Sequence, residues 1–305
     1  MYFHPPEEIE TEVFARLPES LRIRDRRSGW AFGKGDEPLH SFLEGPSFDR
    51  AGNLYLVDIP YGRILRVSPA AEWDVVAEYD GWPNGLKIHA DGRIFIADHR
   101  RGIMRLDPAT GTVAPVLEYV RREGFKGVND LVFASNGDLY FTDQGQTGLQ
   151  DPTGRVLCLR ADGKVDCLID KVPSPNGIVL TADERVLLVA VTRANQIWRL
   201  PLHADGTTTK VMAFITLSGG LTGPDGLALD EQGSLAIAHC GLGTVWLFSR
   251  LGEPLYRIKS CEGLSTTNVA YGGADQRSLY ITESESGTIL RARLPVAGHP
   301  LYSHR

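Results

Sequence analysis

Six oxygen-bearing side chains recur along the chain, each near the start of a short apolar segment. The intervals between successive members are 40, 45, 47, 49 and 42 residues. The six residues are Glu44, Asn84, Asn129, Asn176, Asp225 and Thr267. Carboxylate and amide oxygens are the ligands that Ca²⁺, Mg²⁺ and Mn²⁺ prefer. The set therefore predicts one divalent metal site, if the fold brings the six positions together.

An ordinary structural role is the alternative for each of these residues. Asn and Asp before Gly are common turn residues, and their side chains cap nearby backbone groups. We favour that role for Asn84 and Thr267. Glu44 is different, because Glu is rarely buried unless it is paired. A second carboxylate facing it, Asp225, would repel it unless a cation or a proton lies between them.

The segments that carry these residues have the pattern of β-hairpins. After Glu44 come a short apolar run, a turn at 49–53 and a second apolar run at 54–58, which predicts two antiparallel strands. Every copy continues into a third strand, and the first five continue into a fourth, more polar one. Four strands per repeat at a period of about 45 residues is typical of a β-propeller. In that fold the innermost strands run beside a central channel, which would gather the six residues into one ring.

The sixth copy has three predicted strands, and residues 11–17 offer the missing one. This segment precedes the first copy and has no partner there. Pairing with the last blade would close the ring and remove an exposed sheet edge. The prediction is an all-β, six-bladed propeller with four antiparallel strands per blade, forming one domain over residues 1–305. Residues 1–43 would hold the closing strand and an irregular approach to the first blade.

Two segments depart from the repeat, at 19–43 and at 144–153. Long loops within compact folds are more often functional than accidental. We expect both to lie near a mouth of the channel, where either would act as a partial lid.

A second column of residues stands at the end of the next predicted strand in each repeat. Its members are Asp58, Asp98, Asp143, Val191, His239 and Glu283. We expect the three aspartates to hydrogen-bond to the neighbouring blade. His239 and the nearby His99 are candidates for substrate contacts, because imidazole donates hydrogen bonds and transfers protons near neutral pH. A satisfied polar role is the alternative for both histidines.

The composition of the chain limits the kinds of molecule that it is expected to bind. The 305 residues carry a formal net charge of −6, which supplies no basic footprint for nucleic acid and argues against an acidic membrane surface. The N-terminal residues lack the pattern of a signal peptide, and no apolar run approaches the length of a membrane span. We therefore expect a cytoplasmic protein that is a monomer or a weak homo-oligomer and acts on a small molecule.

Four short motifs give the chain a resemblance to a known family. Together they resemble the hallmark motifs of the SMP-30/gluconolactonase family, the regucalcin-like lactonases, in the expected order and blades. The resemblance spans all six repeats, roughly residues 44–294. The motifs are Leu43-Glu44-Gly45-Pro46, Val128-Asn129-Asp130, Pro175-Asn176-Gly177-Ile178 and Gly223-Pro224-Asp225-Gly226.

The resemblance implies an activity and a role for each matching residue. It implies hydrolysis of a lactone to a hydroxy acid, with a metal bound by Glu44, Asn176 and Asp225. Asp225 would also act as general base, while Asn129 and the following Asp130 would bind the substrate. One position departs from the family pattern: sugar lactonases often carry Arg two residues before this Asn, and here that residue is Gly127.

The implied cofactor is one divalent ion, Ca²⁺ before Mg²⁺, Mn²⁺ or Zn²⁺. Two other functions remain open at this stage. One is a propeller without catalysis that binds a ligand or a partner and holds a structural ion. The other is a paraoxonase-like arylesterase. No Gly-x-Ser-x-Gly motif is present, which argues against a serine esterase.

Overall fold

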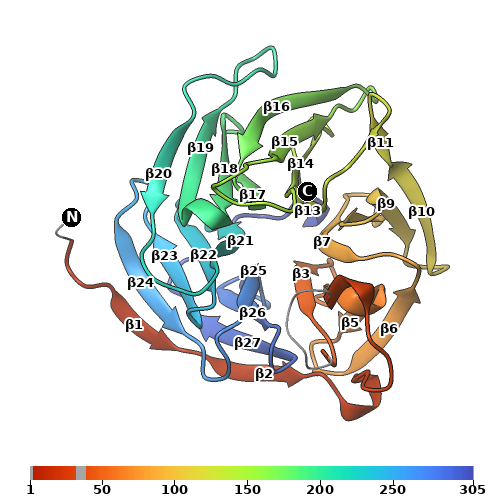
Figure 1. Cartoon of the computed structure of the whole chain (residues 1–305). Helices are drawn as coiled ribbons and strands as arrows, with labels where there is room; N and C mark the ends of the chain where they lie inside the picture. The colour runs from red at the N-terminus through yellow and green to blue at the C-terminus, as the bar shows by residue number, and fades with distance from the viewer. Residues whose placement is uncertain (1–2, 32–38, 305) are drawn as a thin grey trace.

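The computed structural model describes residues 3–31 and 39–304, and within them the strands form six blades around a central axis (Figure 1). The predicted six-bladed β-propeller is confirmed. Residues 33–36 of the approach segment lie outside the described residues. None of the helices in the described ranges has the length and apolar character needed to cross a membrane.

Each blade is an antiparallel meander that begins at the axis and ends at the rim. Blade 1 contains β3 (Leu43–Phe48), β4 (Leu54–Asp58), β5 (Arg63–Val67) and β6 (Trp73–Glu78). Blade 2 contains β7 (Pro83–Ile88), β8 (Ile94–Asp98), β9 (Gly102–Asp107) and β10 (Thr112–Leu117). Blade 3 contains β13 (Val128–Phe133), β14 (Leu139–Asp143), β15 (Gly154–Leu159) and β16 (Val165–Val172).

The other three blades follow the same order. Blade 4 contains β17 (Pro175–Leu180), β18 (Val186–Val191), β19 (Gln196–Pro201) and β20 (Met212–Thr216). Blade 5 contains β21 (Gly223–Leu229), β22 (Leu235–Cys240), β23 (Thr244–Phe248) and β24 (Pro254–Lys259). Blade 6 contains β25 (Thr266–Gly272), β26 (Ser278–Glu283) and β27 (Thr288–Arg293).

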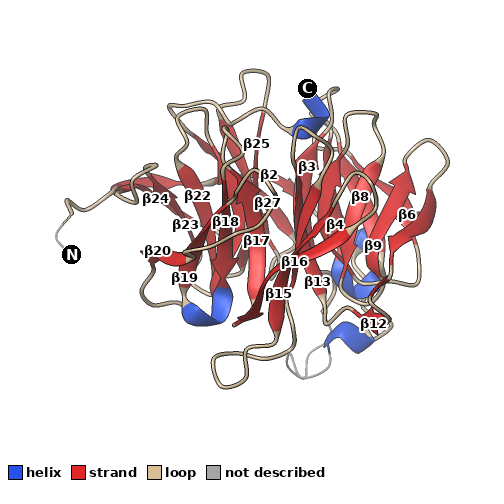
Figure 2. Cartoon of the chain, turned by 90° about the horizontal axis from the view of Figure 1, so that it is seen from above, coloured by secondary structure: helices blue, strands red, loops and turns tan. Residues whose placement is uncertain are grey.

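The remaining elements of the described chain are short. A two-stranded hairpin joins β11 (Tyr119–Val120) to β12 (Glu123–Gly124) after blade 2. Single-turn 3₁₀ helices occur at η1 (Glu19–Leu21), η2 (Gly29–Ala31), η3 (Ile59–Tyr61), η4 (Thr192–Ala194) and η5 (Tyr302–His304). In Figure 2, which is turned by 90° from Figure 1, strands make up most of the chain.

The hydrophobic core lies between blades rather than at one centre. Each of the main buried clusters combines side chains from two neighbouring blades. Between blades 1 and 2, for example, Val57 packs with Leu86 and Ile96. Burial of such side chains stabilises the fold by about 1.5–3 kcal/mol for each residue. Stacking therefore fixes the angle of every blade and the place where its innermost strand meets the axis.

The N-terminal segment closes the ring as predicted. Strand β2 (Glu12–Arg16) pairs antiparallel with β27 and completes blade 6. A second strand was not predicted: β1 (Glu7–Glu10) adds in parallel to β24 of blade 5. Its sequence, Glu-Glu-Ile-Glu, has the acidic composition of a solvated segment. Lys259 of β24 lies within ion-pair distance of Glu8 and Glu10, and only the fold supplies that partner.

The four carboxylates of the second column anchor the starts of the innermost strands in blades 1, 2, 3 and 6. Arg63 pairs with Asp58, and Arg155 pairs with Asp143. The predicted bond to the neighbouring blade is found for Asp98, which accepts the hydroxyl of Tyr79 in the segment after β6 of blade 1, whereas the charged partners of Asp58 and Asp143 belong to their own blades. The carboxylates accept backbone N–H groups just before the innermost strand: Asp58 from Phe42, Asp98 from Trp82, Asp143 from Lys126 and Glu283 from Ser265.

Because β2 closes the ring, a charged side chain on its buried face is expected to destabilise the fold strongly. Ala15 is buried in the apolar cluster between blade 6 and blade 1, so Ala15→Asp places an unpaired carboxylate there. We expect a loss of about 3–5 kcal/mol in the free energy of unfolding, measured by urea denaturation. The neighbouring Arg16→Ala, which removes only an exposed ion pair with Glu262, is expected to cost less than about 1 kcal/mol. Equal losses in the two variants would contradict a closing role for the buried face of β2.

Candidate functional site

Each innermost strand has a β-bulge where its ring residue lies. The pairing register with the second strand shifts between Glu44 and Ser47 in blade 1, and at the equivalent place in the other five blades. A bulge bends the strand and turns a side chain away from the sheet face. The expectation that Asn84 occupies a turn is therefore wrong, since it lies inside β7.

Glycine after the ring residue lets neighbouring strands approach closely. A Cβ atom at Gly45 would lie 2.8 Å from the carbonyl oxygen of Asn84, and one at Gly177 would lie 2.3 Å from that of Asp225. Any side chain at these positions would push the strands apart. Successive innermost strands also contact one another around the ring. The predicted column is therefore brought together at one end of the channel.

Three amides of the ring have no hydrogen-bond partner for their side chains within the described chain. Asn84, Asn129 and Asn176 are each at most 8% exposed, yet none donates or accepts a side-chain hydrogen bond there. Buried polar groups normally have partners. These amides are therefore available to a ligand at the axis.

Glu44 is held by two donors on one carboxylate oxygen. Its Oε2 accepts the backbone N–H of Gly45 at 2.6 Å and the Nδ2 of Asn268 at 2.8 Å. Its Oε1 makes no hydrogen bond to the described residues. Burial raises the pKa of Glu44 to about 7, and the nearby Asp130 adds to the rise. Oε1 of Glu44 is therefore able to bind a ligand at the axis.

Asn268 was missed by sequence reasoning, which placed Thr267 in the ring. The hydroxyl of Thr267 bonds to Thr282, Ser284 and the carbonyl of Leu43, so its expected structural role is confirmed. The next residue, Asn268, points to Glu44 instead. The bulge in β25 decides which of the two side chains faces the axis.

Asp130 lies beside the ring rather than in it. Its carboxylate accepts the N–H of Leu131 at 2.8 Å and lies 3.7 Å from the Nζ of Lys87. Burial raises its pKa, while Lys87 opposes that rise. Asp130 therefore belongs to a buried charged group in the channel that also includes Glu44.

The two ring carboxylates share a neighbour. Burial raises the pKa of the Cys240 thiol, and the charges of Asp225 and Glu44 raise it further. Cys240 pairs with Gly223 across blade 5, which places its thiol beside the ring. Asp225 and Glu44, from blades 5 and 1, therefore converge on the same region.

The donor set fits a hard divalent cation. No cluster of three or more His, Cys, Asp or Glu residues that suits a metal occurs among residues 3–31 and 39–304. The ring instead combines carboxylate oxygen from Glu44 and Asp225 with unpartnered amides. Oxygen ligands of this kind suit Ca²⁺ or Mg²⁺. A cation would also offset the burial of Glu44.

The structure places the two candidate histidines differently. His99 lines a cavity of about 720 Å³ at the ring mouth, together with Asn84 and Trp82. His239 is completely buried. Its Nδ1 accepts the indole N–H of Trp246 at 3.2 Å, and the loop around Gly220 packs against its other nitrogen. The fold therefore brings His99 to the site and holds His239 beneath a loop.

Both irregular segments reach the ring mouth. Residues 144–150 of the loop after β14 line the cavity, as do Gly29 and Trp30 of the approach segment. The expectation that these segments lie near a channel mouth is confirmed for their described parts. Ser174 and Arg193 of blade 4 complete the lining.

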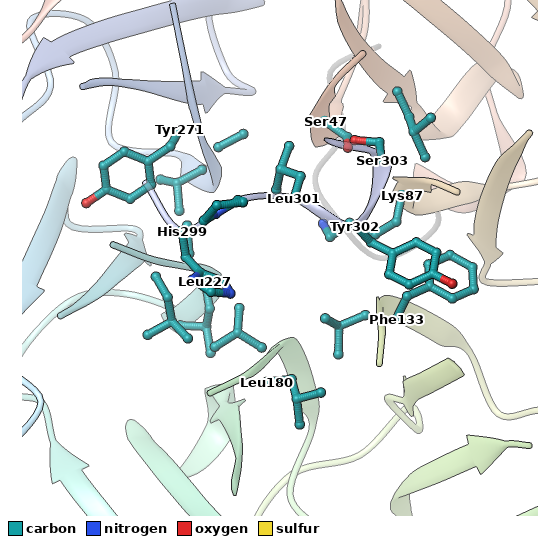
Figure 3. Close-up of a pocket in the computed structure, with 18 of the residues that line it drawn as sticks. Ser47, Lys87, Phe133, Leu180, Leu227, Tyr271, His299, Leu301, Tyr302 and Ser303 are labelled. Atoms are coloured by element: carbon teal, nitrogen blue, oxygen red, sulfur yellow. The ribbon is translucent and has the colours of Figure 1, made fainter. Parts of the chain in front are cut away.

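The opposite mouth of the channel has a different character (Figure 3). An apolar cavity of about 110 Å³ lies there, and the segment carrying His299, Leu301 and Tyr302 crosses the opening. The ring of Tyr302 stacks on Phe133 at 5.0 Å, and Arg50 donates to the carbonyl of Ser303 at 2.7 Å. Apolar side chains such as Leu180 and Leu227 contribute to the lining at this end.

Known proteins share this propeller and its motifs. Residues 42–285 match the family described as the SMP-30/gluconolactonase/LRE-like region. Lactonase drp35 of Staphylococcus aureus is 34% identical over 230 residues, which cover 71% of this chain and 69% of that protein. Lactonase drp35 of Staphylococcus epidermidis is 33% identical over the same shares.

Solved structures confirm the fold. Regucalcin from Agrobacterium tumefaciens, described as a calcium-binding protein, superimposes with a TM-score of 0.80 at 22% identity, covering 99% of this chain and 100% of that one. A gluconolactonase from Xanthomonas campestris gives a TM-score of 0.74 at 23% identity, covering 97% and 99%.

The fold and the ring of oxygen-bearing side chains define a six-bladed propeller with a polar site at one mouth. The family match covers most of the chain, and the chain belongs to the SMP-30/gluconolactonase/LRE-like family. The resemblance drawn from the four motifs is thereby confirmed.

The raised pKa of Glu44 predicts how pH affects the free energy of unfolding of the metal-stripped protein. The unfolded chain loses this proton near pH 4.5, whereas the fold keeps it until about pH 7. Stability therefore falls as pH rises through this window, by at most about 3 kcal/mol. We expect the loss in the wild type but not in Glu44→Gln, measured by urea denaturation in EDTA from pH 4.5 to 8. Identical pH profiles for the two proteins would show that Glu44 is not held protonated.

Proposed function

We propose that this protein hydrolyses a lactone to the corresponding hydroxy acid, with a divalent metal ion bound by Glu44, Asn176 and Asp225. The main support is the group of buried amides and the Glu44 oxygen that have no hydrogen-bond partners among residues 3–31 and 39–304. Membership of the family and relatives named lactonases support the same reaction. Ca²⁺ is our first choice of metal, ahead of Mg²⁺, Mn²⁺ and Zn²⁺.

The ion, when bound, supplies Lewis-acid polarisation of the lactone carbonyl. Glu44 contributes a carboxylate whose orientation is fixed by Asn268 and the Gly45 N–H. Asn129 is proposed to donate a hydrogen bond to the substrate oxygen and so to orient it. Asp130, with its charge balanced by Lys87, supports the backbone beside Asn129.

Asp225 is the proposed general base. One water is consumed: its oxygen bonds to the carbonyl carbon, and Asp225 takes its proton. The ring C–O bond then breaks, and the same proton passes to the departing ring oxygen. The cavity beside the ring, lined by the 144–150 loop and Trp30, would hold the body of the lactone. We propose His99 as a substrate-side residue of this cavity, while His239 would reach a ligand only if the loop around Gly220 moved.

Removal of the metal and of the ring carboxylates tests this function. We expect EDTA-treated protein to release no acid from a panel of sugar and aliphatic lactones, and activity to return with one of the divalent ions. Glu44→Gln and Asp225→Asn are each expected to lower kcat/KM at least about 100-fold. The exposed Glu231 and Asp162 provide matched controls, because Glu231→Gln and Asp162→Asn remove the same charges away from the ring.

The same assay separates the alternatives. Full activity in EDTA, or in both ring variants, would exclude the metal-dependent reaction. Binding of the ion without turnover of any lactone would leave a binding propeller with a structural ion. Preference for aryl esters over every lactone would instead identify an arylesterase.

A further inference from the structure

A further set of channel-lining residues stands three positions after each member of the ring. Three residues along a strand span at most about 10 Å, so this set lies one step from the ring toward the opposite mouth. All six line the apolar cavity of that mouth, where Figure 3 labels two of them, Ser47 and Lys87. We call this set the channel column: Ser47, Lys87, Val132, Val179, Ala228 and Ala270.

Lys87 is the one charged member of the channel column. Its side chain is 19% exposed, and its Nζ lies 3.7 Å from Oδ1 of Asp130, whose side chain is 2% exposed. A Cβ atom at Gly85 would lie 2.8 Å from the same carboxylate oxygen, so this glycine lets the strand of Lys87 approach Asp130. The channel therefore contains a largely buried pair of opposite charges next to the ring.

The charge of Lys87 acts on two carboxylates. Burial raises the pKa of Glu44 and of Asp130, and the charge of Lys87 opposes the rise in each case. Glu184 also lines the cavity, but its two carboxylate oxygens accept hydrogen bonds from Ser135. Lys87 therefore supplies positive charge to Glu44 and Asp130 from within the protein.

These contacts define the charge that an ion at the ring would meet. Glu44, Asp225 and Asp130 carry three negative charges when ionised, and Lys87 carries one positive charge. Uncompensated charge is costly in a buried site. One divalent ion would neutralise the two negative charges that Lys87 leaves, whereas a trivalent ion would leave one positive charge unmatched.

We propose that Lys87 is a specificity-determining residue of the metal ring: its ammonium neutralises Asp130 and so matches the ring to one divalent cation rather than to a trivalent one. Lys87 acts through its charge and not as a ligand, because an ammonium group has no acceptor electron pair. This inference rests on the proposed metal site, and it adds the residue that sets the charge of the ion.

Calorimetry with two ions of similar size and different charge tests the proposal. The affinities for Ca²⁺ and for Tb³⁺ are measured at pH 7 with the wild type, Lys87→Met, Asp130→Asn and the double variant. Lys164→Met is the matched control, because it removes the same charge from the turn between β15 and β16, where the side chain is 68% exposed.

Opposite shifts in the two single variants are the expected result. Asp130→Asn leaves the ammonium of Lys87 unbalanced, and we expect binding about tenfold weaker for Ca²⁺ and about thirtyfold weaker for Tb³⁺, because repulsion grows with the charge of the ion. Lys87→Met is expected to strengthen binding by the same factors. The double variant lacks both charges and is expected to bind each ion within about twofold of the wild type, as is Lys164→Met.

Three results would overturn the proposal. Binding by the double variant as weak as that of Asp130→Asn would show that the loss of Asp130 does not act through the charge of Lys87. Equal shifts for the two ions, or weaker binding in Lys87→Met, would show that Lys87 does not select the charge of the ion. If Lys87→Met alone fails to fold, the comparison of Asp130→Asn with the double variant still decides the proposal.

Lactone turnover by the same proteins separates this proposal from the proposed function. Ion selectivity that follows charge as expected, without turnover of any lactone, would reject the reaction and leave the role of Lys87 intact. Metal-dependent turnover with a selectivity that Lys87→Met does not change would reject the role of Lys87 and leave the reaction intact. Absence of ion binding in every protein would reject the metal site together with the role of Lys87.

Discussion

The close approach of six innermost strands at the axis is the constraint on which the structure depends. Positions 45 and 177 require glycine, Gly45 and Gly177, because a Cβ atom there would collide with the backbone of the next blade. The same crowding excludes water from Glu44 and raises its pKa. A buried carboxylate and unpartnered amides are costly to hold in this way, and that cost is offset when a ligand occupies the axis. The stability and the function of this mouth are therefore linked.

Two columns of similar residues have opposite roles because their hydrogen bonding differs. In the second column, Asp98 accepts the backbone N–H groups of Trp82, Arg100 and Arg101 and the hydroxyl of Tyr79, which leaves little capacity for a ligand. Glu44, Asn84, Asn129 and Asn176 of the ring instead keep oxygen atoms that have no hydrogen-bond partner among the described residues. Carboxylates whose oxygens already accept hydrogen bonds hold the strands in place. The ring residues without such partners are available to bind a ligand. Residue type alone does not distinguish these two situations.

Departures from the repeat give the two mouths different properties. The loop at 144–153 lies over the ring mouth and is pinned by Gln146 to Lys126 and His99. At the other mouth, Tyr302 and the residues around it cross the channel and pack on Phe133. The repeated blades supply the framework, whereas these insertions set the shape and polarity of what can enter.

The blade pattern and the ring were predictable from the sequence, because strand periodicity and the spacing of Glu44, Asn176 and Asp225 are local features that the propeller repeats. Other features depended on contacts between distant segments. Asn268 reaches Glu44 only through a bulge in the last blade, and His239 is buried only because the loop around Gly220 covers it. Strand β1 pairs with β24, which lies far away in the sequence. Side-chain direction and burial are set by neighbours far apart in the chain, so only the tertiary structure decided them.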